Sequence, residues 1–134
     1  MGVETAINTG ALFGAGAGWG KWFAMLSIVA AIGILAWLFG WGAAEDRWLT
    51  VALGCVMAGI IGNLYDRLGL WYEPGMPLEW SSGVRDWILL RYRTREWTWP
   101  NFNIADSLLV CGAAMLFVHA FFERRPQPEP KHEP

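Results

Sequence analysis

Three long stretches without a charged residue constrain the fold of this chain more than any other feature. They cover residues 22–44, 48–65 and 107–122. An α-helix rises about 1.5 Å per residue, so about 20 apolar residues cross a hydrocarbon layer of about 30 Å. The third stretch reaches that length if residues 103–106 form its first turn at the interface. We therefore predict three transmembrane helices.

Composition agrees with a membrane protein. Hydrophobic residues make up 54% of the 134 residues and charged residues 16%, against roughly 25% charged residues in an average soluble domain. The net charge of −2 offers no basic surface to a phosphate backbone, so no nucleic acid partner is expected. The length fits one domain, and the predicted fold class is an all-α membrane protein.

The predicted organisation is a single integral membrane domain at residues 1–122 and a polar, proline-rich tail at 123–134 that we expect to be disordered. The loop at 67–102 is expected to hold a small β region, and the basic residues on the two sides of the predicted membrane do not decide which side this loop occupies. A short link makes the first two helices an antiparallel hairpin. The expected spans are residues 20–42, 48–66 and 103–122.

Several other features favour ordinary packing over chemistry. Cys55 and Cys111 lie in apolar runs without a CxxC pattern, so we expect small packing residues rather than a metal site. His119 is expected to be a hydrogen-bonded packing residue. The glycine-rich segment at 14–21 fails both the Walker and the GxGxxG patterns, and we interpret it as a flexible interfacial segment.

The second span ends in a polar group. Asn63 and Arg67 are four residues apart and share a helix face. Arg67 suits the negative end of the helix dipole, but an anion such as Asp66 is repelled there unless it is paired. Both readings, a helix end that reaches water and a functional group, remain open from these residues alone.

The third span opens with a second polar group. Asn103 and Asp106 are typical of a helix start, and they share a face at the edge of the membrane, where an ionisable group suggests function. Asp86, beside Arg85, precedes an apolar run that could be a strand or a short helix, and taken singly it is more simply a solvated loop residue. Two carboxylates brought together would have to share a proton.

Three motifs, in order along the chain, resemble those of bacterial lipoprotein signal peptidase, also called signal peptidase II. Residues 62–67, Gly-Asn-Leu-Tyr-Asp-Arg, match the family's GNxxDR motif, and residues 102–106, Phe-Asn-Ile-Ala-Asp, match FNxAD. Residues 8–13, Asn-Thr-Gly-Ala-Leu-Phe, are similar to N-x-G-A-x-F. The similarity extends from about residue 8 to residue 122.

The resemblance implies a multi-pass intramembrane aspartic endopeptidase of the bacterial inner membrane, with its active site at the extracytoplasmic face. Such an enzyme removes the signal peptide of a prolipoprotein before a cysteine that carries diacylglycerol. The implied partners are this substrate and membrane lipids, no cofactor or metal is implied, and a monomer is expected. The implied catalytic residues are Asp86 and Asp106, and the implied substrate-binding residues are Asn8, Asn63, Arg67 and Asn103.

The roles of the two acids follow from their surroundings. We expect Asp106 to be the base, because a helix N-terminus favours its anion, and Asp86 to hold the shared proton. Arg85 would depress the pKa of Asp86 if its guanidinium lay close. Residues 71–83 look like an insertion relative to the family. The family usually has four spans, and we interpret this chain as lacking the first, through truncation or a late start.

The competing hypothesis is a membrane protein without catalysis. It would be an inactive relative that binds lipoprotein precursors, or a scaffold that packs through Gly54, Ala58 and Gly62, which recur at every fourth position. Turnover that disappears when the two acids are replaced would distinguish the peptidase from both. A transporter ranks third, because Asp66 and Asp106 lie at span ends rather than at the midplane.

Overall fold

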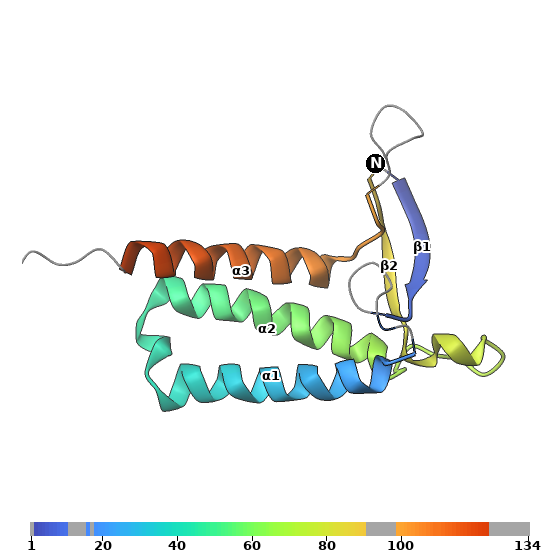
Figure 1. Ribbon diagram of the computed structural model, residues 1–134, viewed down its shortest axis with the longest axis horizontal. Coiled ribbons are helices and arrows are strands. Elements are labelled where there is room, and N and C mark those ends of the chain that lie inside the picture. Colours follow the sequence, from blue (N-terminus) through green and yellow to red (C-terminus); the bar gives the residue numbers. More distant parts are fainter. Residues whose placement is uncertain (1, 11–15, 17, 91–98, 124–134) are drawn as a thin grey trace, which may run out of the picture.

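The bundle of helices carries a small sheet across one end (Figure 1). The computed structural model describes residues 2–10, 16, 18–90 and 99–123. The predicted disordered tail, from residue 124 on, and the segments at 11–15 and 17 lie outside this description, as do the last three residues of the N-x-G-A-x-F match.

Three helices in the described part of the chain are long and apolar enough to cross a membrane. They are α1 (Gly20–Gly40), α2 (Arg47–Arg67) and α3 (Ile104–Glu123), with α2 between the other two. The predicted fold class, a helical membrane protein with three spans and a small β region, is confirmed. The helix ends differ from the expected spans by at most two residues.

The link between α1 and α2 explains why the first helix is shorter than its apolar run. Gly42 adopts the left-handed conformation, with a φ of 75°, which ends the helix before residue 42. The 3-10 turn η2 (Ala43–Glu45) follows, and Asp46 caps α2 by accepting a 3.0 Å hydrogen bond from the backbone of Leu49. The two helices form the expected antiparallel hairpin.

His119 of α3 joins this end of the bundle. Its Nε2 lies 3.2 Å from Oδ2 of Asp46, and the indole nitrogen of Trp48 donates to the Met115 carbonyl over 3.0 Å. His119 is therefore a hydrogen-bonded packing residue, as predicted. These contacts tie the start of α2 to the last turns of α3, far from the sheet.

The helices α2 and α3 pack closely through small residues, but through a different stripe from the one expected. A Cβ added to Gly59 would lie 2.6 Å from the Ala105 carbonyl oxygen. Gly54 has nothing within 4 Å of such an atom and Ala58 is exposed, so only Gly62 of the predicted stripe faces α3. The expectation for Gly54 and Ala58 is wrong, because lipid is as apolar as a helix interface and small residues occur on both faces.

The sheet pairs two segments that are far apart in the sequence. Strand β1 (Gly2–Asn8) runs antiparallel to β2 (Val84–Leu89), with Asn8 opposite Val84 and Ala6 opposite Asp86. The described part of the loop at 67–102 supplies β2 and one bridging residue, Phe102, to the expected β region, whereas the paired strand comes from the start of the chain. Val, Thr and Ile alternate with other residues along β1, a period-two signal that could have identified the strand.

The segment between α2 and β2 folds into turns and the 3-10 helix η3 (Leu78–Ser82). It extends beyond the helix ends (Figure 1) and returns against the first turn of α1, where Gly20 leaves no room for a side chain beside Ser82. It then enters β2 at Val84, so an extension of the loop does not displace the strand.

Candidate active site

The two implied catalytic carboxylates lie in one groove at the sheet end of the bundle. Asp86 comes from β2 and Asp106 from the first turn of α3, and both line a cavity of about 900 Å³ between the sheet and the helices. Asn8, Asn63 and Arg67 line the same cavity. Asp86 is buried, at 4% exposed, and so is Asn103.

Asn103 connects the two acids. Its Nδ2 donates to Oδ1 of Asp86 over 2.9 Å, and its backbone N–H donates to Oδ2 of Asp106 over 3.0 Å. The Asp106 backbone returns a 3.0 Å bond to Oδ1 of Asn103. This reciprocal pair of hydrogen bonds is a capping box. The same bonds that begin α3 therefore also fix the position of the Asp106 carboxylate relative to Asn103.

Backbone pairing places Asn103 beside β2. The Ile88 backbone N–H donates to the Phe102 carbonyl over 2.8 Å, and the Phe102 N–H returns a 3.2 Å bond to the Ile88 carbonyl. Phe102 therefore extends the sheet by one bridge just before α3 begins. The next residue is Asn103, which brings the FNxAD motif against the strand that carries Asp86.

Two further amides complete the network. Asn63 of α2 donates to Oδ1 of Asp106 over 2.8 Å and accepts a 3.0 Å bond from Asn103. Asn8, at the end of β1, donates to Oδ2 of Asp86 over 3.2 Å. All three implied asparagines thus contact at least one of the two acids, and each carboxylate keeps lone pairs for water or substrate.

Arg67 approaches the groove from the last turn of α2. Its Nη2 donates to the Gly10 carbonyl over 2.9 Å, and its guanidinium lies over the Phe23 ring, 4.9 Å from the centroid. These contacts hold a fixed positive charge at the edge of the cavity that contains both carboxylates.

The environment of Asp86 favours its protonated form. Burial, and to a lesser extent the nearby charge of Asp106, raise the pKa of Asp86 to about 6, against the opposing effects of the hydrogen bonds from Asn8 and Asn103 and the charge of Arg67. A carboxyl group with this raised pKa keeps its proton to a higher pH than an ordinary aspartate, and in that form it can act as an acid. This supports the assignment of the shared proton to Asp86.

The raised pKa makes folding stability depend on pH. Between about pH 4 and pH 6 the folded protein holds a proton on Asp86 that the unfolded chain has released, so this group's contribution to stability falls as the pH rises. The full change is about 3 kcal/mol, from a shift of about two pKa units. Asparagine does not titrate, so we predict that Asp86→Asn becomes more stable relative to the parent as the pH rises from about 4 to about 6. Thermal unfolding of both proteins in micelles measures this difference. A parent-to-variant difference that stays constant with pH would contradict this.

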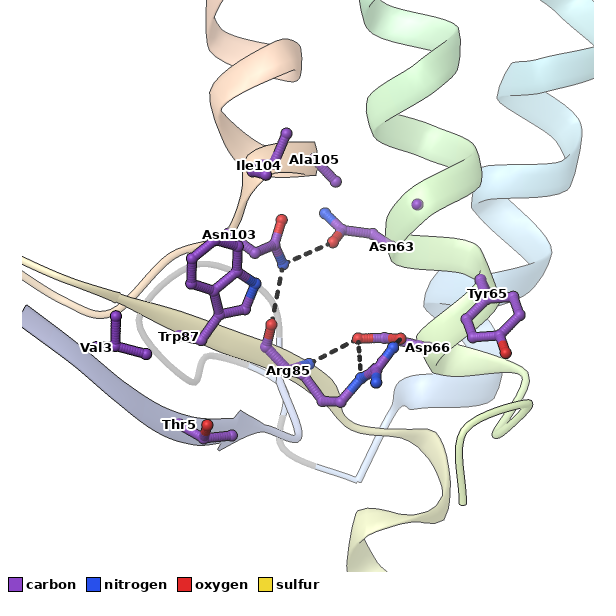
Figure 2. A pocket seen from close by; sticks show the side chains of 11 residues that line it. Val3, Thr5, Asn63, Tyr65, Asp66, Arg85, Trp87, Asn103, Ile104 and Ala105 are labelled. Carbon is purple, nitrogen blue, oxygen red and sulfur yellow. Dashed lines mark hydrogen bonds and ion pairs between the residues drawn. The ribbon is translucent and has the colours of Figure 1, made fainter. Parts of the chain in front are cut away.

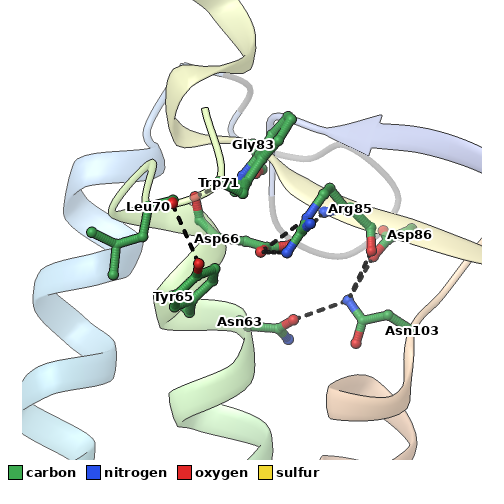
Figure 3. Close-up of polar contacts among 9 residues, drawn as sticks. All are labelled: Asn63, Tyr65, Asp66, Leu70, Trp71, Gly83, Arg85, Asp86 and Asn103. Atoms are coloured by element: carbon green, nitrogen blue, oxygen red, sulfur yellow. Dashed lines mark hydrogen bonds and ion pairs between the residues drawn. The ribbon is translucent and has the colours of Figure 1, made fainter. Parts of the chain in front are cut away.

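Arg85 does not lie against Asp86. Its guanidinium contacts Asp66, with Nη2 2.7 Å from Oδ1, and its backbone N–H donates to Oδ2 over 2.8 Å (Figure 3). The condition under which Arg85 would depress the pKa of Asp86 is therefore not met, because successive side chains of a strand point to opposite faces. The same contact explains how Asp66 is tolerated at a helix C-terminus.

The opposite faces of the sheet line different cavities. Arg85 and Trp87 of β2 face a second cavity of about 580 Å³, together with Val3 and Thr5 of β1 (Figure 2). Asn63 lines both this cavity and the one that contains Asp86, and Asn103 lines this one. Sequence reasoning missed this arrangement, although the alternation along β2 could have indicated it.

The site as a whole is a carboxylate pair with amide donors and one cation. Among the described residues, there is no group of three or more His, Cys, Asp or Glu side chains placed to hold a metal ion. Two acids linked through the side-chain amide and the backbone N–H of one residue, Asn103, with a raised pKa at Asp86, can together donate and accept a proton. A carboxylate pair of this kind is able to activate a water molecule for hydrolysis.

Fold and site define a multi-pass membrane protein with an acid pair at one end of its helices, and the sequence comparison identifies the family. The family described as signal peptidase (SPase) II matches residues 1–122. The chain belongs to this family, which confirms the resemblance of its motifs.

Individual relatives belong to the same family. A lipoprotein signal peptidase of Rhodopirellula baltica is 62% identical over 121 residues, covering 90% of this chain and 54% of that protein. One of Pseudomonas syringae pv. tomato is 39% identical over 124 residues, covering 90% of this chain and 64% of the relative. The chain thus spans about half to two thirds of the length of these curated relatives.

A solved structure shares the fold. It is described as a bacterial membrane enzyme, and it superposes with a TM-score of 0.74 at 23% identity, covering 98% of this chain and 71% of the other.

Proposed function

We propose that this chain is an aspartic endopeptidase that removes signal peptides from diacylglyceryl-modified prolipoproteins. The observation that carries the proposal is the connection of Asp86 and Asp106 through Asn103 in a groove at the sheet end of three apolar helices. Family membership supports the same activity. The inner membrane is the proposed location, with the groove at the extracytoplasmic face, and a monomer is the proposed state.

The reaction needs one ionised and one protonated carboxyl group. Asp106 takes a proton from a water molecule, and the oxygen of that water attacks the scissile carbonyl carbon. Asp86 gives its proton to the carbonyl oxygen. The tetrahedral diol then collapses. The carbon–nitrogen bond breaks, Asp106 gives its proton to the leaving amine, and Asp86 recovers a proton from the diol. At the end of the cycle Asp106 is again ionised and Asp86 is again protonated, and one water molecule has been consumed.

The surrounding residues suit an extended peptide in a place with little water. Backbone amides of a substrate cannot remain unpaired in hydrocarbon. Asn8, Asn63 and Arg67 line the groove and offer polar partners to such a backbone. The apolar outer surfaces of α1 and α3 leave the acyl chains of the substrate in the surrounding lipid.

The test reconstitutes the chain in lipid with a prolipoprotein whose cysteine carries diacylglycerol. We expect cleavage on the amino side of that cysteine, identified by the masses of the two products, and little cleavage of the same substrate without the lipid. If the lipidated precursor binds but remains intact, the alternative of a non-catalytic precursor-binding relative is correct and the peptidase proposal is not.

A further inference from the structure

Asp66 is a buried acid that the proposed reaction does not use. It is 6% exposed, in the last turn of α2. Arg85 contacts it with the backbone N–H at 2.8 Å, Nη2 at 2.7 Å and Nε at 3.1 Å. A planar guanidinium held at two nitrogens is fixed in direction as well as position. The contact therefore orients the residue that precedes Asp86.

Trp71 joins the same group of residues (Figure 3). Its indole nitrogen lies 3.2 Å from the carbonyl oxygens of both Asp66 and Gly83, and so bridges the end of α2 and the start of β2. The Arg85 guanidinium lies over its ring, 5.2 Å from the centroid. Asp66, Trp71 and Arg85 close the base of the segment that leads from α2 to β2.

The closure brings the two ends of that segment into contact. Gly69 has a φ of +69°, and a Cβ there would lie 2.5 Å from the carbonyl oxygen of Ser81. Residues between these points can therefore extend outward without moving β2. The part that looks like an insertion, residues 71–83, begins with Trp71 itself.

We infer that Asp66, Trp71 and Arg85 form a positioning clasp that holds Asp86 toward Asp106 across the base of the inserted segment. The inference rests on the proposed function, in which Asp86 is catalytic. Arg85 and Asp86 are neighbours on opposite faces of β2, so anchoring Arg85 through both its backbone and its side chain limits the rotation of the strand. Acid–base catalysis needs such positions held within about 0.5 Å.

The clasp can be weakened at one residue. Trp71→Phe keeps a six-membered aromatic ring at this position and removes the five-membered ring of the indole, with the N–H that bridges Asp66 and Gly83. Trp48→Phe is the matched control, because it removes an indole N–H bonded to the Met115 carbonyl at the other end of the bundle. Arg85→Gln removes the guanidinium, and Arg85→Lys restores the charge without the two-nitrogen contact.

Two measurements in lipid test the clasp. The first gives kcat and KM for cleavage of the lipidated prolipoprotein, and the second is amide hydrogen exchange of residues 84–89, which form β2. For Trp71→Phe and Arg85→Gln we expect kcat to fall about 10-fold with KM within about twofold, since binding of the lipidated peptide does not need the exact position of Asp86. Exchange in β2 should be about 10-fold faster. Trp48→Phe should match the parent, and Arg85→Lys should recover part of kcat.

The outcomes separate the clasp from the proposed function. If the parent chain cleaves nothing, the proposed function is wrong. Faster exchange of β2 in the Trp71→Phe and Arg85→Gln variants would then still support the clasp as the anchor of this strand. Unchanged exchange in both variants overturns the clasp whatever the parent does. A rise in KM with an unchanged kcat also overturns it, because these residues would then bind substrate rather than position Asp86.

Discussion

Turnover of a diacylglyceryl prolipoprotein is expected to fall about 10³-fold or more when Asp106 is replaced by asparagine, and by a similar factor for Asp86→Asn. Each variant removes one of the two groups that move protons, and such groups contribute roughly 10²- to 10⁴-fold. The hydrogen bond from Asn63 to Oδ1 of Asp106, at 2.8 Å, can persist with an amide oxygen in place of the carboxylate. The expected defect therefore lies in kcat, measured at saturating substrate.

A matched control comes from the other end of the bundle. Asp46→Asn also replaces a carboxylate at a helix start, and asparagine is an equally good cap. Its turnover should stay close to that of the parent. An Asp106→Asn variant that retained more than about a tenth of the parent turnover would exclude the acid pair, since an amide cannot take up the proton.

The double variant tests whether the acids act as one unit. Groups that work together in a single step are strongly non-additive, so losing the second costs little once the first is gone. We expect Asp86→Asn with Asp106→Asn to be no more than a few-fold slower than either single variant. Multiplied defects would instead indicate two independent contributions.

The helices could be predicted from sequence because the bilayer imposes a length and a composition on each of them. The pairing of β1 with β2 was not foreseen, because Asn8 and Asp86 are 78 positions apart. Pairing at that distance depends on how the bundle brings its ends together. Local patterns such as the alternation in β1 could indicate a strand but not its partner.

The candidate site was found through its sequence motifs. The resemblance of those motifs to a known family pointed to six residues, and the structure brings them together at one groove. What neither motif nor spacing could give was the partner of Arg85. Adjacency in sequence suggested Asp86, whereas a strand sends neighbouring side chains to opposite faces and so directs Arg85 to Asp66. Asp66 itself was identified as needing a partner, because an unpaired anion is unfavourable at a helix C-terminus.

The largest effect on stability is expected from Gly112→Val in α3. A Cβ at Gly112 would lie 2.6 Å from Cγ2 of Val56 and 2.8 Å from the Ala52 carbonyl oxygen of α2. A side-chain methyl group can rotate away, but a helix carbonyl cannot. Valine should therefore separate the helices and destabilise the fold by about 3 kcal/mol, measured by unfolding in micelles with increasing denaturant.

Gly54→Val is the matched control for this change. It introduces the same side chain into a membrane helix, but at a position where nothing lies within 4 Å of the added Cβ. The intrinsic cost of valine in a helix is the same for both, so the difference between the two variants measures the α2–α3 contact alone. Equal stabilities would show that the close approach of the two helices is not needed for the fold.

The same separation should reach the groove, because the helix contact and the acid network lie on the same pair of helices, α2 and α3. Asn63 of α2 bonds both Asp106 and Asn103 at the start of α3, over 2.8 and 3.0 Å. Moving α3 away from α2 breaks these bonds even in molecules that remain folded. Gly112→Val should thus lose turnover beyond its loss of folded protein, whereas Gly54→Val should keep the parent turnover per folded molecule. This would make the small residues between α2 and α3 part of how the acids are held together.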